Sequence, residues 1–355
     1  MRPIPIQYAK ENTVLGETLY TARGQVLLKA GTQLDKKKLS QIKNHNIHTI
    51  YIKDPHSDFE VNRLLEQSMR IKGVMLIKEI FDNAAYNQSI MGLNDQLSKY
   101  ADTVLYEIKS FKSQKIEYVD IKNIDIYLYS SALNVALISA LLAWEMKLND
   151  EMVKHVFIGA IYHDIGMALL PAAVTFKTEA LTTEEKMMII NHPVMGHGYI
   201  KERNYLSAYV KTIVMTHHEC IDGTGYPGRM KGDDIHKTAQ IVGLADIYDA
   251  MTSDRPYKMA VSPKESIEYI MGVAGRKYDT ALVNAFLRLV SPYPRGTLVK
   301  LSNGQVAVVD QLNDNFPLRP KIRVIHKDNQ TYTYDAIDLE YRQDLTIEDI
   351  VYDII

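Results

Sequence analysis

The sequence predicts a central all-α domain flanked by two small β-rich modules, which makes the chain α+β overall. Apolar residues recur at helical spacing through most of residues 59–289, whereas short β-type runs with glycine turns occupy both ends. Histidines and acidic residues gather inside the helical part, so we expect the functional site there. The predicted units are a β-rich accessory module, a helical connector, the helical domain and a second β-rich module, at residues 1–55, 56–118, 119–291 and 292–355.

The composition is that of an ordinary globular protein, with 46% hydrophobic and 24% charged residues among 355. The 41 lysines and arginines nearly balance the 43 aspartates and glutamates, so we expect no binding of long nucleic acid. Cys220 is the only cysteine, which indicates a reducing compartment and predicts a cytoplasmic location. Polar residues or tryptophan interrupt each long apolar stretch, so no membrane span is expected.

The N-terminal module is predicted from alternating β-type runs separated by glycines, in residues 4–8, 14–20 and 26–28. Asp35 opens a charged helical stretch, and residues 48–54 have the composition of a closing strand.

Long helices are predicted next. Residues 59–111 keep helical spacing with few breakers, and they form either core or a pair between protomers, so we expect a homodimer through this connector. Helical patterning continues through 125–148 and 150–165, and Thr182 with Glu185 predicts a capping box at the start of another helix.

The C-terminal module is predicted to begin after Ser291, where PYPRG marks a boundary. Three β-type runs follow, LVKLSNGQVAVVDQL, KIRVIHKD and TYTYDAIDLEY, with Asn-Gly and Asp-Asn as turn signals.

The chemistry is predicted from histidines in the helical part, since seven of the eleven lie between His155 and His236. His163 and Asp164 end an apolar run, FIGAIYHDIG, where an unpaired imidazole and carboxylate would be costly to bury. Imidazole and carboxylate ligands together suit iron, manganese or zinc, and a pair of such ions activates water and holds phosphate oxygens. The pattern therefore predicts a metal site that hydrolyses phosphodiesters.

Four motifs in order give this site a family resemblance: HDIG at His163, HP at His192, HHECIDGTGYP from His217 to Pro227, and ADIYDAMTSDRPYK from Ala245. Over residues 125–289 the chain resembles the HD-GYP family, a branch of the HD phosphohydrolases. The resemblance implies an all-helical domain that hydrolyses cyclic di-GMP, a bacterial second messenger, to linear pGpG or GMP. It also implies bound divalent transition metal, iron or manganese first, with zinc, nickel or magnesium as alternatives.

Residue roles follow from the matching positions. The implied metal ligands are His163, Asp164, His192, His217, His218 and Asp246, with Asp164 as the bridging ligand. Asp164 and His192 are assigned to catalysis. The implied substrate-binding residues are Gly225 and Tyr226 in the signature loop and Arg255 and Lys258 at the anionic groups of the ligand. Glu219 and Asp222 are expected either to orient imidazoles or to serve only as solvated turn residues.

Two departures from the family pattern predict a reduced metal centre. Ser131 stands where the family has a ligand histidine, so we expect one firmly bound metal and a weak or absent second one. Met167 replaces a lysine that stabilises phosphate charge, a loss on the order of a hundredfold in rate. A third metal is not expected, because its supporting glutamate would fall at Tyr127. His155 and His197 are expected to be structural.

Several functions remain open at this point. An impaired cyclic di-GMP phosphodiesterase and an inactive cyclic di-GMP receptor explain the departures equally well. A phosphohydrolase for another nucleotide is disfavoured by the GYP loop. A purely structural set of histidines would leave the adjacent pair, His217 and His218, without a reason in a glycine-rich loop.

Overall fold

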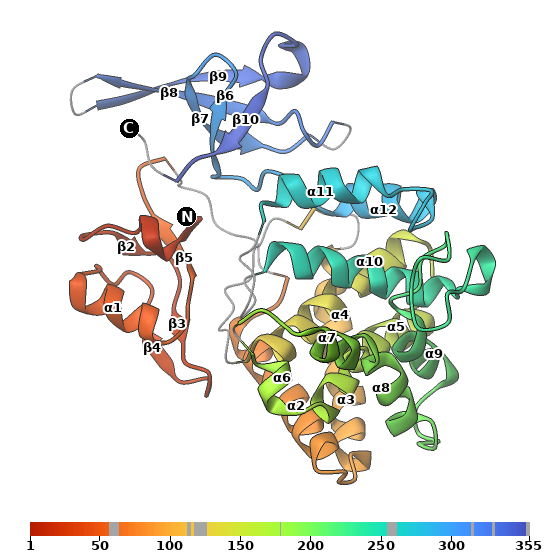
Figure 1. Cartoon of the computed structure of the whole chain (residues 1–355). Coiled ribbons are helices and arrows are strands. Elements are labelled where there is room, and N and C mark those ends of the chain that lie inside the picture. Colours follow the sequence, from red (N-terminus) through yellow and green to blue (C-terminus); the bar gives the residue numbers. More distant parts are fainter. Residues whose placement is uncertain are drawn as a thin grey trace.

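The computed structural model describes residues 1–56, 64–111, 115–116, 126–177, 179–253, 261–313, 316–328 and 331–352. It confirms the predicted α+β class, with a central helical domain between two β modules (Figure 1).

The N-terminal module is an antiparallel sheet in the order β1-β5-β2 beside a two-stranded β3-β4 hairpin and one helix. Its elements are β1 (Arg2–Pro5), β2 (Val14–Leu15), β3 (Leu19–Tyr20), β4 (Val26–Leu28), α1 (Lys36–Asn44) and β5 (Thr49–Lys53). Asp35 caps α1 as expected, accepting a hydrogen bond from the Lys38 amide. The strand expected over residues 14–20 is instead two strands, because Gly16 donates to the Tyr51 carbonyl and the chain then leaves the sheet.

The connector is a helical hairpin of α2 (Gln67–Ala85) and α3 (Met91–Ile108). Asn87 separates the helices with a left-handed backbone, φ +52°, a conformation that asparagine tolerates better than most residues. Gly73 lets the helices cross closely, since a Cβ there would lie 2.1 Å from the Tyr100 hydroxyl. The connector packs against α4 and α5 of the helical domain as part of the same hydrophobic core.

The centre of the helical domain is α4 (Tyr127–Glu145), which is mainly apolar and is buried on all sides. By length and composition it could span a membrane, but 94% of its most apolar window is buried inside the fold. A mainly apolar helix in that setting is a core helix. It packs against α2, α5, α10 and α12.

The remaining helices complete the domain: α9 packs on α5 and α10, α8 packs on α9, and α11 packs on α10 (Figure 1). Asn149 caps α5, and the capping box predicted at Thr182 and Glu185 is confirmed at the start of α7. The bounds are α5 (Asp150–Tyr162), α6 (Ala172–Thr175), α7 (Thr183–Ile190), α8 (His192–Ile200), α9 (Ala208–Thr216), α10 (Lys237–Thr252), α11 (Pro263–Gly272) and α12 (Thr280–Leu289), with a short 3₁₀ helix, η4 (Ile165–Leu169), between α5 and α6.

The C-terminal module is a five-stranded antiparallel sheet in the order β10-β6-β7-β8-β9. Its strands are β6 (Leu298–Leu301), β7 (Val306–Gln311), β8 (Lys321–Asp328), β9 (Thr331–Asp338) and β10 (Ile347–Ile350). Gly304, at φ +84°, forms the expected turn between β6 and β7. Strand β10 is not predicted by the sequence, because its four residues, IEDI, carry too little apolar alternation to indicate a strand.

The two terminal modules contact each other through the last described residues, which brings the chain ends together (Figure 1). The Tyr352 ring stacks on Tyr8 at 4.9 Å, and its carbonyl accepts a hydrogen bond from Arg2. His56, directly after the N-terminal module, shares a 2.9 Å hydrogen bond with the Tyr334 hydroxyl of β9.

Candidate metal centre

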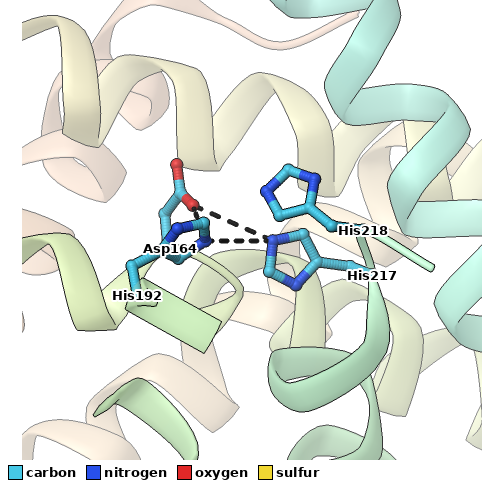
Figure 2. Close-up of side chains that lie close together, drawn as sticks. All are labelled: Asp164, His192, His217 and His218. Carbon is cyan, nitrogen blue, oxygen red and sulfur yellow. Dashed lines mark hydrogen bonds and ion pairs between the residues drawn. The ribbon is translucent and has the colours of Figure 1, made fainter. Parts of the chain in front are cut away.

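The expected ligand residues come from the ends of helices that surround α4 and from the middle of α10. His163 is the C-cap of α5 and Asp164 starts η4. His192 begins α8, His217 is the C-cap of α9, and His218 follows it. Helix ends far apart in the sequence therefore face one another across a small space (Figure 2).

Four of these side chains converge closely enough to share one ion. One ligand atom from each of Asp164, His192, His217 and His218 lies within 4.8 Å of the others. The Asp164 Oδ1 atom is 3.0 Å from His192 Nε2 and 3.9 Å from His217 Nε2 (Figure 2). No other such group of three or more occurs within the described ranges.

His163 and Asp246 adjoin this group. His163 Nε2 lies 3.4 Å from Asp164 Oδ2 and 3.7 Å from Asp246 Oδ1, and His218 Nδ1 lies 4.0 Å from Asp246 Oδ2. Gly243 permits this approach of α10, since a Cβ there would be 2.2 Å from the His217 carbonyl oxygen. Asp246 follows three residues later on the same face of the helix.

Backbone carbonyls fix the orientation of three imidazoles. The Nδ1 atoms of His163, His192 and His217 lie 2.7, 2.7 and 3.1 Å from the carbonyl oxygens of Ala160, Ile189 and Ile213. A carbonyl only accepts, so each Nδ1 carries a proton, and Nε2 is the ring atom that would coordinate a cation. A carbonyl oxygen has two lone pairs, so the Ile213 carbonyl accepts from both the amide and the ring of His217.

The resulting arrangement fits a divalent cation. Nε2 of His192 and Nε2 of His217 lie 3.3 Å apart, a separation at which the two nitrogens can share one proton or bind one cation. His163 Nε2 is buried and has no hydrogen-bond partner. Imidazole nitrogens oriented by a bond at the opposite ring nitrogen, together with a carboxylate, form a typical transition-metal donor set.

The electrostatics of the group favour charge on Asp164. Burial opposes ionisation, but the imidazoles of His163 and His192 hold the pKa of the Asp164 carboxyl well below its usual value. Burial and the neighbouring imidazole of His218 push the pKa of His217 well below its usual value, so its ring is neutral. Burial also lowers the pKa of His163, but Asp164 and Asp246 outweigh it and raise that pKa to about 9.

The chain matches known families in two places. Residues 116–282 match an HD domain, and residues 298–353 match a KOW domain associated with HD domains. A cyclic di-GMP phosphodiesterase of Pseudomonas aeruginosa is 31% identical over 227 residues, which cover 64% of this chain and 55% of the relative. A cyclic di-GMP phosphodiesterase of Thermotoga maritima is 31% identical over 193 residues, covering 54% of this chain and 51% of the relative. The chain thus spans about half the length of these relatives.

A 3'3'-cGAMP-specific phosphodiesterase of Vibrio cholerae is 32% identical over 126 residues, covering 35% of this chain and 24% of the relative. Among solved structures, an HDG"Y"P protein from Bdellovibrio bacteriovorus has a TM-score of 0.50 at 16% identity, covering 80% of this chain and 97% of that one. This likeness extends the shared fold well beyond the helical domain.

The central domain is an HD domain, similar in sequence to the cyclic di-GMP phosphodiesterases of the HD-GYP family. An HD domain is a divalent metal-binding domain, and in this member its histidines and aspartate cluster as such a site requires.

The first departure from the HD-GYP pattern has a structural counterpart at Ser131. The Ser131 hydroxyl donates a 2.5 Å hydrogen bond to Asp249 Oδ2, which is not one of the four clustered residues. Asn134 donates to the other oxygen of Asp249 at 3.2 Å and accepts a 2.7 Å hydrogen bond from Arg70 of α2. Position 131 therefore belongs to a buried polar network that links the connector to α10.

The group of Asp164, His192, His217 and His218 receives no ligand atom from Met167, His155 or His197. Met167 packs its side chain against the hydrophobic core of the domain. His155 stacks on Tyr209 at 5.5 Å, and His197 lies outside the group, which fits the structural role expected for both. Arg255 and Lys258, expected to bind the ligand, lie outside the described residues.

The HD-GYP signature loop folds back over the two histidines. The Tyr226 ring stacks on His218 at 4.7 Å with an interplanar angle of 28°, and its amide donates to the His218 carbonyl. Gly225 is required at the crossing, because a Cβ would lie 2.4 to 2.5 Å from backbone atoms of His218, Glu219 and Cys220. The Tyr226 ring thus forms an aromatic surface beside the metal centre, on the side of the loop.

The expectation that Glu219 or Asp222 orients an imidazole is wrong. Glu219 accepts hydrogen bonds from the amides of Gly228 and Met230, and Asp222 accepts two from Thr224. Backbone carbonyls orient the imidazoles instead. Sequence reasoning could not find them, since every residue carries a carbonyl and only the helix ends make these available.

Substitution of Gly166 tests how the turn that follows His163 and Asp164 is held against α8. A Cβ at Gly166 would lie 1.9 Å from the His192 carbonyl oxygen, so Gly166→Ala has to push Asp164 away from His192. We expect it to lower the free energy of unfolding by about 3 kcal/mol and to weaken metal binding. Urea unfolding and metal titration measure the two effects.

Gly198→Ala in α8 is the matched control, because nothing lies within 4 Å of its added Cβ. It should raise the free energy of unfolding by about 0.5 to 1 kcal/mol, as alanine does in a helix. Equal effects of the two substitutions would contradict the close-approach argument.

Ser131→His tests the reduced metal centre. The substitution would remove the serine hydrogen bond to Asp249. It would add an imidazole nitrogen that can bind a metal ion together with His163 and Asp246. We expect bound metal to rise from about one ion per chain toward two, measured by elemental analysis after anaerobic loading with ferrous iron or manganese.

Ser130→His is the control for adding a histidine to α4, since Ser130 lines a separate cavity beside the N-terminal module. It should leave the metal content unchanged. Two ions per chain in the unsubstituted protein would contradict the role assigned to position 131.

Proposed function

We propose that this protein is a metal-dependent phosphodiesterase that hydrolyses cyclic di-GMP to pGpG or GMP, with one firmly bound metal and low turnover. The observation that carries the proposal is the convergence of Asp164, His192, His217 and His218 beside a signature loop that stacks Tyr226 on His218. Relatives named as cyclic di-GMP phosphodiesterases support this substrate.

We assign the residues of the centre as follows. His163, Asp164, His192, His217, His218 and Asp246 are the proposed metal ligands, and iron or manganese suits their nitrogen and oxygen donors. A divalent ion held there would supply an activated water and neutralise phosphate charge. Asp164 and His192 act closest to the reacting phosphate. Asp164 holds the negative charge that balances the ion, while His192, whose Nδ1 atom donates to the Ile189 carbonyl, offers its Nε2 atom.

The substrate contacts that we propose lie on the loop side of the centre. Tyr226 presents an aromatic face for a guanine base, and Gly225 keeps the backbone close enough for the ligand to reach the histidines. Arg255 and Lys258 bind the phosphates or the base edges. The near balance of charge in the chain agrees with a small nucleotide rather than long nucleic acid as the partner.

Cyclic di-GMP receptor is the second candidate function. It is favoured by Ser131, whose hydroxyl is bonded to Asp249, and by Met167, which packs in the core where the family has a lysine. A protein of either kind would work in the reducing cytoplasm that the single cysteine predicts, and the α2-α3 hairpin remains the proposed dimer contact.

Asp164→Asn decides between the two functions. Cyclic di-GMP and, separately, 3'3'-cGAMP are incubated with manganese-loaded protein, and products are separated by chromatography. We expect slow formation of linear product from cyclic di-GMP, and a drop of at least roughly a hundredfold in the variant, because an amide cannot supply the charge of the carboxylate.

Asp95→Asn, an exposed residue of α3, controls for the loss of one charge and should retain activity. Binding of cyclic di-GMP in calorimetry without product would favour the receptor. Product from 3'3'-cGAMP alone would reassign the substrate, and neither binding nor product from any nucleotide would overturn the proposal.

A further inference from the structure

The carboxylate of Glu219 lies inside the signature loop, where it bonds to the loop backbone. Only 2% of the residue is exposed. Its Oε1 atom accepts from the Gly228 amide at 2.5 Å, and its Oε2 atom accepts from the Met230 amide at 2.9 Å. A buried carboxylate is costly unless it is hydrogen-bonded, and here two backbone donors from one loop converge on it.

The loop is closed at its base on both sides of these bonds. Asp222 pairs with Lys231 in an antiparallel bridge, and the Gly232 amide donates to the Ile221 carbonyl at 3.0 Å. Gly225 contacts the backbone of the histidine segment so closely that no side chain fits. Tyr226 therefore lies between two fixed points, the crossing at Gly225 and the pair of amides bonded to Glu219.

We propose that Glu219 is a positioning residue that holds the Tyr226 ring over His218 and so shapes the substrate side of the metal centre. This inference rests on the proposed function for its effect on the substrate, but its effect on the loop is independent of any ligand. His192 and His217 keep their own carbonyl partners when Glu219 is changed, so the metal should remain bound.

Glu219→Gln is the direct test, because it keeps the size of the side chain but turns one acceptor into an NH₂ group. That group would face a backbone N–H, so one of the two bonds is lost. Hydrogen exchange of the Gly228 and Met230 amides, measured by mass spectrometry, should accelerate roughly tenfold or more. The KM for cyclic di-GMP should rise roughly tenfold while kcat changes much less and metal content stays at the level of the unsubstituted protein.

Asp222→Asn is the matched control in the same loop, since it removes one negative charge but keeps the oxygen that accepts from Thr224. It should leave exchange at Gly228 and Met230 unchanged. If Glu219→Gln does not fold, Glu219→Asp replaces it, because the shortened carboxylate keeps the charge but cannot reach both amides. Faster exchange at these two amides is the expected result there too.

Unchanged exchange in the Glu219 variants, or a loss of metal and kcat at constant KM, would overturn the positioning role. If the unsubstituted protein neither binds nor hydrolyses cyclic di-GMP, the proposed function fails, while the exchange measurement still decides the role of Glu219.

Discussion

The hydrogen bonds from imidazole Nδ1 atoms to carbonyls at helix ends are the constraint on which the candidate centre depends. His163, His192 and His217 each satisfy a carbonyl three or four residues earlier in the chain. The same bond places a proton on Nδ1, so Nε2 is the ring atom left to face the shared space. Each of these histidines therefore lies at the end of a helix or just after it. The bond from its ring back to that helix sets the direction of the ring.

The centre can be this compact because the backbones around it approach without side chains between them. Gly166 brings the HD turn against the first residue of α8, and Gly243 brings α10 against the end of α9. Both contacts involve the backbone of a ligand histidine, so the distances between ligands follow from the packing of the helices. The helix α4 behind them is buried on all sides and supplies the apolar surface against which α5 and α10 pack.

The sequence was sufficient for the class of the fold and for the identity of the residues that converge. Helical periodicity located the core helices, and residue types that are costly to bury revealed the centre, since His163 and Asp164 end an apolar run. It failed where the backbone decides the outcome: the carbonyls that orient the imidazoles, the short strand β10, and the break between β2 and β3. The role of Glu219 was also out of reach, because its partners are the amides of Gly228 and Met230, which no residue type identifies.

Ser131 does more than remove the ligand histidine expected at this position, because its hydroxyl takes part in a buried hydrogen-bond network. Ser131, Asn134 and Asp249 form a buried hydrogen-bonded set, and Arg70 adds a guanidinium from the connector helix. Buried polar groups of this kind are stable only when their partners are satisfied, so an imidazole at position 131 has to displace a bond that Asp249 already accepts. A metal ion gained at this position would therefore compete with the network that joins α2 to α10, three residues from Asp246. Arg70, Asn134 and Asp249 thus join the connector helix α2 to α10, the helix that also carries Asp246.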